Sequence, residues 1–121
     1  MVDGQAAAGA APPDGATPVA AGSLSRASLL RILRRNRPLL DRFGVRRLAL
    51  FGSHAAGTQK PDSDIDLYVE FDAPTYANYL ALAEALEGLF GRKVELLTRA
   101  GLESIRVPAV AQSIRWSLVF V

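Results

Sequence analysis

Polar and apolar side chains alternate over eight consecutive residues, Asp64–Phe71. Successive side chains of a β-strand project to opposite faces of a sheet, so this period of two is typical of a strand with one face in a core. The apolar residues of the segment are therefore expected to be buried, while Asp64 and Asp66 project together from the other face. A strand of this kind needs partner strands, which limits the folds open to a short chain.

The folded part of the chain is expected to be one domain. Residues 1–23 contain 8 Ala, 4 Gly and 3 Pro and carry almost no charge, so we expect a disordered tail there. Residues 24–121 remain for folding, and a segment of roughly 100 residues is enough for a single hydrophobic core.

The order of predicted elements indicates an α+β fold. Helical spacing and end signals predict helices over residues 25–43, 75–90 and 108–116, the first of them split at Pro38 and ended by Gly44. Strands are predicted over residues 45–51, 64–71, 93–98 and 118–121. We therefore expect a small mixed β-sheet flanked by helices.

Composition excludes several kinds of site. The chain has no cysteine and one histidine, which excludes disulfides, thiol catalysis and clusters of thiolate or imidazole metal ligands. A bound metal would be held by carboxylates, which favours Mg²⁺. No run approaches the ~18 apolar residues of a membrane span, and the N-terminus lacks the features of a signal peptide. We expect a cytoplasmic protein without membrane contact.

Charge is distributed unevenly along the chain. Residues 24–47 hold eight arginines and one acid, whereas residues 62–72 hold five acids and no base. The arginine-rich helix is either a solvated face or a weak contact surface for nucleic acid or an acidic partner. The acidic segment is more specific, because its residues are spaced regularly.

Three carboxylates are candidates for a metal site. Asp64 and Asp66 are two residues apart, which places them roughly 6–7 Å from each other on one face of the predicted strand. Two carboxylates aimed at one point repel each other unless a cation lies between them. Glu95 stands in an otherwise apolar run, so the three acids converge if the two strands pair.

A candidate phosphate site precedes this acidic pair. The predicted strand over residues 45–51 ends at Gly52 and Ser53, where backbone N–H groups and a hydroxyl can face a phosphate. On its own such a dipeptide is also an ordinary turn. The combination is more specific, since the segment Phe51-Gly52-Ser53-His54-Ala55-Ala56-Gly57 is followed by Ser63-Asp64-Ile65-Asp66-Leu67.

This combination resembles the minimal nucleotidyltransferases of the DNA polymerase β superfamily, over roughly residues 39–121. The resemblance implies the polymerase β-like nucleotidyltransferase fold, two Mg²⁺ ions and ATP as substrate. It implies that metal ligation and catalysis fall to Asp64, Asp66 and Glu95, with Glu95 activating an acceptor hydroxyl. It implies nucleotide binding by Gly52, Ser53 and Ser63.

The chain departs from the family pattern at three positions. His54 and Ala56 stand where arginines are common, and Glu95 replaces an aspartate. Fewer cations should weaken binding of a triphosphate. His54 either compensates as a protonated group or is an exposed helix residue, and Lys60 is either a second cation or a solvent-facing lysine. Since all three acids are present, we favour an active enzyme.

Membership of the minimal class also implies a partner. Such proteins act as antitoxins that transfer AMP to a hydroxyl of an HEPN-domain ribonuclease toxin. Two alternatives stand beside this one. The chain could block a toxin by contact alone, with weak or no catalysis, or it could be a nucleotidyltransferase that modifies RNA or a small molecule. The motif does not encode the acceptor, the oligomeric state or the base of the nucleotide, for which ATP is the default.

Overall fold

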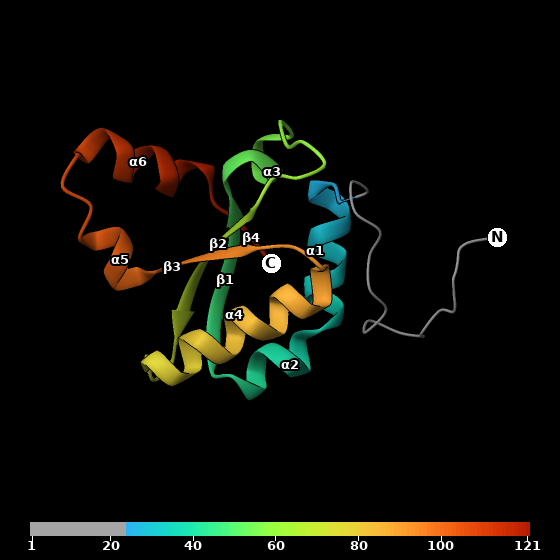
Figure 1. Cartoon of the computed structure of the whole chain (residues 1–121). Helices are drawn as coiled ribbons and strands as arrows, with labels where there is room; N and C mark the ends of the chain where they lie inside the picture. Colours follow the sequence, from blue (N-terminus) through green and yellow to red (C-terminus); the bar gives the residue numbers. More distant parts are fainter. Residues whose placement is uncertain (1–23) are drawn as a thin grey trace.

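A computed structural model describes residues 24–121, and the tail predicted over residues 1–23 lies outside them. The described part forms one mixed sheet with helices on both faces (Figure 1). Its elements are α1 (Arg26–Arg35), α2 (Arg37–Arg42), β1 (Val45–Phe51), α3 (Gly52–Ala56), β2 (Ile65–Phe71), α4 (Tyr76–Phe90), β3 (Val94–Thr98), α5 (Arg99–Glu103), α6 (Pro108–Ser117) and β4 (Val119–Phe120).

The sheet has the strand order β3-β2-β1-β4. β1 pairs antiparallel with β2 and β4, while β2 pairs parallel with β3, so the sheet is mixed and the predicted α+β class is confirmed. α5 was not predicted, because it is too short for a helical period to be visible. It follows β3 directly and begins where the Gly101 N–H donates to the Thr98 hydroxyl at 3.0 Å.

Side chains and glycines set the helix ends. Thr75 caps α4 by accepting a hydrogen bond from the Asn78 N–H at 3.1 Å. Gly44 and Gly91 follow α2 and α4 with φ of +74° and +67°, a conformation that glycine adopts without strain. The predicted break near Pro38 is confirmed, since the proline opens α2 immediately after α1 has ended.

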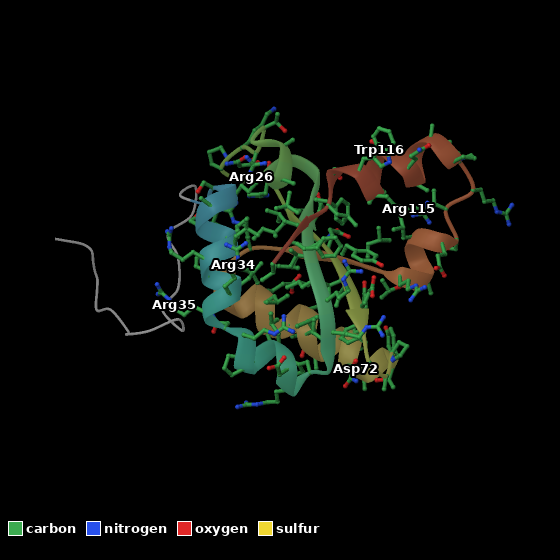
Figure 2. All side chains as sticks on the ribbon, turned by 180° about the vertical axis from the view of Figure 1, so that it is seen from behind. Arg26, Arg34, Arg35, Asp72, Arg115 and Trp116 are labelled. Atoms are coloured by element: carbon green, nitrogen blue, oxygen red, sulfur yellow. The ribbon has the colours of Figure 1, made fainter. Side chains whose placement is uncertain are left out.

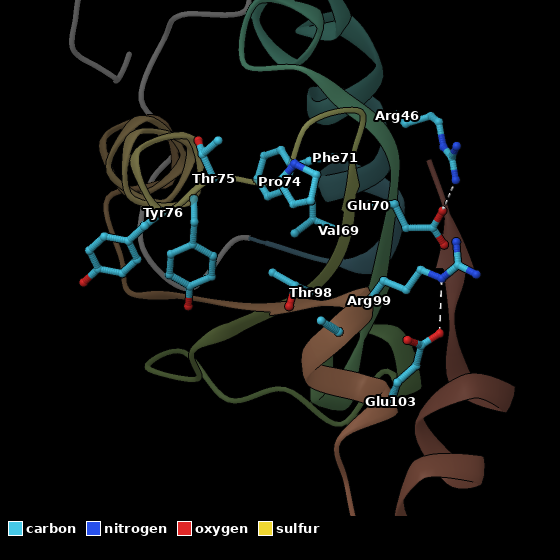
Figure 3. Close-up of a pocket in the computed structure, with 12 residues that line it drawn as sticks. Arg46, Val69, Glu70, Phe71, Pro74, Thr75, Tyr76, Thr98, Arg99 and Glu103 are labelled. Atoms are coloured by element: carbon cyan, nitrogen blue, oxygen red, sulfur yellow. Dashed lines mark hydrogen bonds and ion pairs between the residues drawn. The ribbon is translucent and has the colours of Figure 1, made fainter.

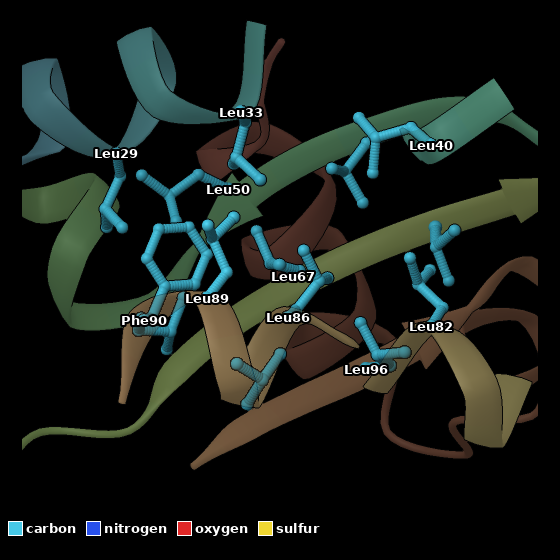
Figure 4. Packing of buried hydrophobic residues seen from close by; sticks show 14 of the residues in the cluster. Leu29, Leu33, Leu40, Leu50, Leu67, Leu82, Leu86, Leu89, Phe90 and Leu96 are labelled. Carbon is cyan, nitrogen blue, oxygen red and sulfur yellow. The ribbon is translucent and has the colours of Figure 1, made fainter. Parts of the chain in front are cut away.

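The main core lies between one face of the sheet and helices α1, α2 and α4 (Figure 4). Leucines of these helices pack against the inward side chains of β1 and β2. Among the fully buried members are Leu29, Leu33, Leu40, Leu82, Leu86 and Phe90 from the helices and Leu50, Ile65, Leu67 and Val69 from the strands. The apolar side of the alternating segment is therefore buried as predicted.

The other face of the sheet is covered as well. Tyr68 and Ala49 pack with Leu102 of α5 and Ala111 of α6 in a second, smaller cluster. β2 is consequently buried on both faces from Leu67 onward, which the alternating pattern did not predict. Asp66 alone remains partly open to solvent in this strand, and this restricts any site on β2 to the end where the strand begins.

Two side chains of α4 attach this helix to β3. The Tyr79 hydroxyl donates to the Leu96 carbonyl at 3.2 Å, and a Glu87 carboxylate oxygen accepts from the Val94 N–H at 3.1 Å. Both bonds involve backbone groups of β3, so they fix the strand as well as the helix. Among residues 24–121 no helix is both long and apolar enough to cross a membrane, and the longest, α4, has 15 residues.

The core makes a direct prediction about stability. Leu86→Ala should lower the free energy of unfolding by about 2–5 kcal/mol, because the fully buried leucine leaves a cavity. Leu80→Ala on the same helix is the control, since Leu80 is 42% exposed and should cost far less. Urea unfolding followed by circular dichroism measures both, and equal losses would contradict the packing described here.

Candidate active site

Strand pairing brings the predicted residues together at one end of the sheet, where β1 ends and β2 and β3 begin. Phe51, the last residue of β1, is the register partner of Asp66 on β2, and Asp66 is in turn the partner of Glu95 on β3. α3 begins at Gly52 directly after β1. The condition for the acids to approach each other, that the two acid-bearing strands pair, is therefore met, and the Gly-Ser turn lies beside them.

Gly52 allows the turn to approach the carboxylate. Its φ is +74°, and a Cβ atom placed on it would overlap the Asp66 carboxylate. Any residue with a side chain would be strained there and would also displace Asp66. The backbone at the start of α3 therefore lies directly against the Asp66 side chain.

Asp66 is in an unfavourable electrostatic environment. Partial burial raises the pKa of its carboxyl, and the neighbouring charges of Glu95 and Asp64 raise it further. A raised pKa in the folded state means that the ionised form destabilises the fold once the pH is above that pKa. A cation at this position would relieve the repulsion.

Glu95 already has a cationic neighbour. Its Oε2 atom lies 3.1 Å from Nζ of Lys93, and this ion pair raises the pKa of the lysine. Sequence reasoning assigned no role to Lys93, although its spacing of two from Glu95 on a strand placed both on one face. Within residues 24–121 no three acidic or imidazole side chains lie close enough together to enclose a metal ion.

The two predicted serines differ in their surroundings. The Ser53 hydroxyl makes no hydrogen bond to any other residue among those described, so it is available to a ligand. Ser63 Oγ accepts from the Lys60 N–H at 2.8 Å, and the Ser63 carbonyl accepts from the Arg92 guanidinium at 3.3 Å. Ser63 thus shapes the loop before β2, and Lys60 is exposed on that loop.

His54 matches neither of the two roles expected of it. The side chain is completely buried, and its two ring nitrogens have no hydrogen-bond partner among the described residues. Burial lowers the pKa of the imidazole, and the charge of Arg92 lowers it further, while the Asp64 backbone acts in the opposite direction. A histidine with a lowered pKa is neutral at pH 7, so His54 is neither an exposed residue nor a replacement cation.

The donor atoms suit Mg²⁺ in kind, since carboxylate oxygens are its preferred protein ligands. Burial and the charges of Glu95 and Asp64 raise the pKa of Asp66, so a cation beside it would be favourable. Asp64 and Asp66 therefore fit a hard cation, whereas Glu95 forms an ion pair with Lys93.

Comparison with known proteins identifies the family. The model of the "Nucleotidyltransferase domain" family matches residues 28–120, which is most of the chain. The chain belongs to this family. The match includes the Gly-Ser turn and all three predicted acids, and the prediction of a nucleotidyltransferase enzyme is confirmed.

Two relatives indicate which kind of nucleotidyltransferase the chain is similar to. The chain is 45% identical over 94 residues to "Putative protein adenylyltransferase MJ1379" of Methanocaldococcus jannaschii, covering 74% of this chain and 91% of that one. It is 37% identical over 84 residues to protein adenylyltransferase MntA of Thermococcus cleftensis, covering 69% and 81%.

Solved structures agree with the relatives. One described as "Structure of putative minimal nucleotidyltransferase" superimposes with a TM-score of 0.64 at 28% identity, covering 80% of this chain and 96% of that one. A second, a toxin–antitoxin structure with AMP-PNP, gives a TM-score of 0.53 at 26% identity and covers 80% and 72%. The expected minimal nucleotidyltransferase fold is confirmed.

The contact at Gly52 can be tested with two glycines of similar backbone. Gly52→Ala should destabilise the protein more than Gly57→Ala. Both residues have positive φ, but a Cβ at Gly57 meets nothing within 4 Å. Gly57→Ala should then cost about 1 kcal/mol from backbone strain alone. Thermal unfolding measures the difference, and equal costs would show that Asp66 does not lie against Gly52.

Proposed function

We propose that this chain is a Mg²⁺-dependent protein adenylyltransferase that moves AMP from ATP to a hydroxyl group of a partner toxin, and that it thereby acts as an antitoxin. The observation that carries the proposal is the alignment of Gly52, Asp66 and Glu95 across three neighbouring elements. The Gly-Ser turn, Asp66 and Glu95 are then neighbours, as the candidate phosphate site, metal ligand and base.

The comparisons support the chemical class of the reaction. Two relatives covered over more than four fifths of their length carry the name protein adenylyltransferase. A structurally similar chain comes from a toxin–antitoxin structure with AMP-PNP, an analogue of ATP. These names favour ATP as the nucleotide and a protein as the acceptor.

Each residue then has a defined task. The backbone N–H groups at Gly52 and the free Ser53 hydroxyl would bind the terminal phosphates of ATP. Asp64 and Asp66 would hold Mg²⁺, with Glu95 completing the set. When bound, the metal supplies positive charge that stabilises the phosphoryl oxygens during in-line displacement.

The transfer step needs a base for the acceptor. The acceptor hydroxyl oxygen forms a bond to the α-phosphorus of ATP as the bond from that phosphorus to the pyrophosphate oxygen breaks. Glu95 would accept the hydroxyl proton, and pyrophosphate would leave. Most of the rate then comes from alignment and electrostatic stabilisation, because no atom of this chain forms a covalent bond with the nucleotide.

For the partner we propose an HEPN-domain ribonuclease toxin, on the resemblance to minimal nucleotidyltransferases. One observation favours a second candidate, an antitoxin that acts by contact alone. Glu95 is paired with Lys93, and His54 is neutral, so the site has an occupied base and few cations for a triphosphate. The exposed arginines of α1, such as Arg31 and Arg34, favour a third candidate that modifies RNA.

Metal binding is the first test. Mg²⁺ with ATP at roughly 100-fold its Kd should stabilise the native chain by about 2.7 kcal/mol, seen as a higher Tm. Asp64→Asn combined with Asp66→Asn should abolish this gain without destabilising the free protein, because the substitutions remove the repulsion described above. An unchanged gain in the double variant would remove these two residues from the site.

AMP transfer is the second test. With its toxin, Mg²⁺ and ATP labelled in the α-phosphate, the parent chain should label the toxin and release pyrophosphate. Asp66→Ala should abolish transfer while the complex still forms, and Glu95→Gln should slow transfer by a factor of about 10² or more, since the base is lost. Asp72→Ala is the matched control, because Asp72 is an exposed acid beyond the other end of β2.

A cellular assay separates the enzyme from the contact-only antitoxin. If Asp66→Ala protects cells from the toxin as well as the parent does, catalysis is dispensable and the contact-only candidate is correct. If RNA rather than the toxin is labelled, the third candidate is correct. Loss of protection with an intact complex supports adenylylation.

A further inference from the structure

Three cavities meet around the short helix α5, away from the Gly-Ser turn. The largest, of about 760 Å³, lies between the N-terminal end of α4 and α5 (Figure 3). A second, of about 320 Å³, shares Arg46, Glu70, Arg99 and Glu103 with the first. A third, of about 400 Å³, shares Leu102, Glu103 and Arg115 with the second. The three cavities adjoin through these shared residues, and we call the surface that they make up the α5 groove.

The middle of the α5 groove is positively charged. Four arginines line the second cavity together with two glutamates; they are Arg46, Arg47, Arg99 and Arg115, with Glu70 and Glu103. Two guanidinium charges therefore remain without a compensating carboxylate in this cavity. Arg115 makes no ion pair with any described residue, and it stands exposed on α6.

A buried carboxylate holds two of these arginines in place. Glu70 is only 9% exposed, and its oxygens lie 3.1 Å from Arg46 and 3.7 Å from Arg47. The Tyr68 hydroxyl also donates to Glu70 at 2.6 Å, and the tyrosine and arginine bonds together lower the pKa of the glutamate. The cationic centre is thus pre-organised, which reduces the entropy lost when an anion binds.

Exposed aromatic residues lie at both ends of the groove. Tyr76 is 76% exposed and stacks on Tyr79, with ring centroids 6.3 Å apart, at the α4 end (Figure 3). Trp116 is 82% exposed at the α6 end. Aromatic residues and arginines contribute much of the binding energy in protein interfaces, and here the arginines lie between the two aromatic ends.

The second cavity, which holds the cationic centre, is on the same face of the sheet as the proposed catalytic acids. Asp66, Tyr68 and Glu70 follow each other at alternate positions of β2, so their side chains project to one side. Glu70 is four residues from Asp66, which places the cationic centre roughly 13 Å from Asp66 along the strand. A polypeptide that extends from the cationic centre toward the start of β2 would reach the proposed catalytic acids.

We infer that the α5 groove binds a segment of the acceptor protein in which acidic residues are flanked by aromatic or aliphatic ones. Guanidinium groups take carboxylates in a bidentate geometry, and the aromatic ends suit apolar side chains. Glu70 and Glu103 interrupt the positive charge, so the groove is poorly suited to the continuous phosphate backbone of RNA. The inference depends on the proposed function in one respect: it takes the bound segment to belong to the protein that accepts AMP.

The test uses the full chain as bait for a random peptide library displayed on phage. Selected peptides should be rich in Asp or Glu next to aromatic or aliphatic residues. The strongest of them, labelled with fluorescein, should bind at least about ten-fold less tightly when its acids are changed to amides. Selected peptides without acidic enrichment, or equal affinity of the amide version, would overturn the inference.

Variants locate the binding to the groove. The combination of Arg99→Ala and Arg115→Ala should weaken the peptide by about ten-fold or more, and Trp116→Ala should also weaken it. The matched control changes Arg34 and Arg35 to alanine, because these exposed arginines of α1 lie on the opposite side of the molecule from Arg115 and Trp116 (Figure 2). Equal loss in the control would mean that only overall charge matters.

Two further measurements separate this inference from the proposed function. ATP binding by the variant with Arg99→Ala and Arg115→Ala should equal that of the parent; a loss would assign the groove to the nucleotide and overturn the inference. The inference would also be overturned if a single-stranded RNA oligomer displaced the labelled peptide at a lower concentration than the unlabelled acidic peptide does. If AMP transfer succeeds while no peptide binds the groove, only the docking inference fails.

Discussion

The central position of β2 in the sheet is the constraint on which the site depends. β2 is hydrogen-bonded to β1 on one side and to β3 on the other, and a single register aligns Phe51, Asp66 and Glu95. A slip of one residue would turn Asp66 into the core and expose Ile65 or Leu67. The buried leucine layer beneath the strand therefore positions the acids, although none of its members touches a substrate.

Two carboxyl groups on the same face of this strand have opposite electrostatic environments. The pKa of Asp66 is raised by burial and by the acids beside it, whereas the pKa of Glu70 is lowered by the Tyr68 hydroxyl and by arginines. The Glu70 carboxylate has hydrogen-bond and ion-pair partners, whereas the neighbours of the Asp66 carboxylate that shift its pKa are acids. Perturbed carboxyl groups of this kind are common at functional sites, which supports the proposed metal site at the start of β2.

Much of this could be predicted from the sequence, because the relevant signals are local. The alternation in Asp64–Phe71 predicted both the strand and its buried side, and Thr75 and Gly91 predicted the ends of α4. The ion pair between Lys93 and Glu95 is local, but the sequence shows only that both side chains are on one face of the strand and not that their charged groups meet. Burial of His54 could not be predicted, since it depends on segments distant in the chain. The charged groove depends on tertiary contacts in the same way, as its arginines come from separate elements.

The bonds between α4 and β3 have a consequence for how this protein can associate. β3 is the outer strand of the sheet, and its Val94 N–H and Leu96 carbonyl are already occupied by Glu87 and Tyr79. At the opposite edge β4 contains only two residues. An open edge invites another chain to add a strand, and covering it with side chains prevents this. Two hydrogen-bonding groups of β3 are thus unavailable to an added strand, so this edge is a poor place for another chain to pair.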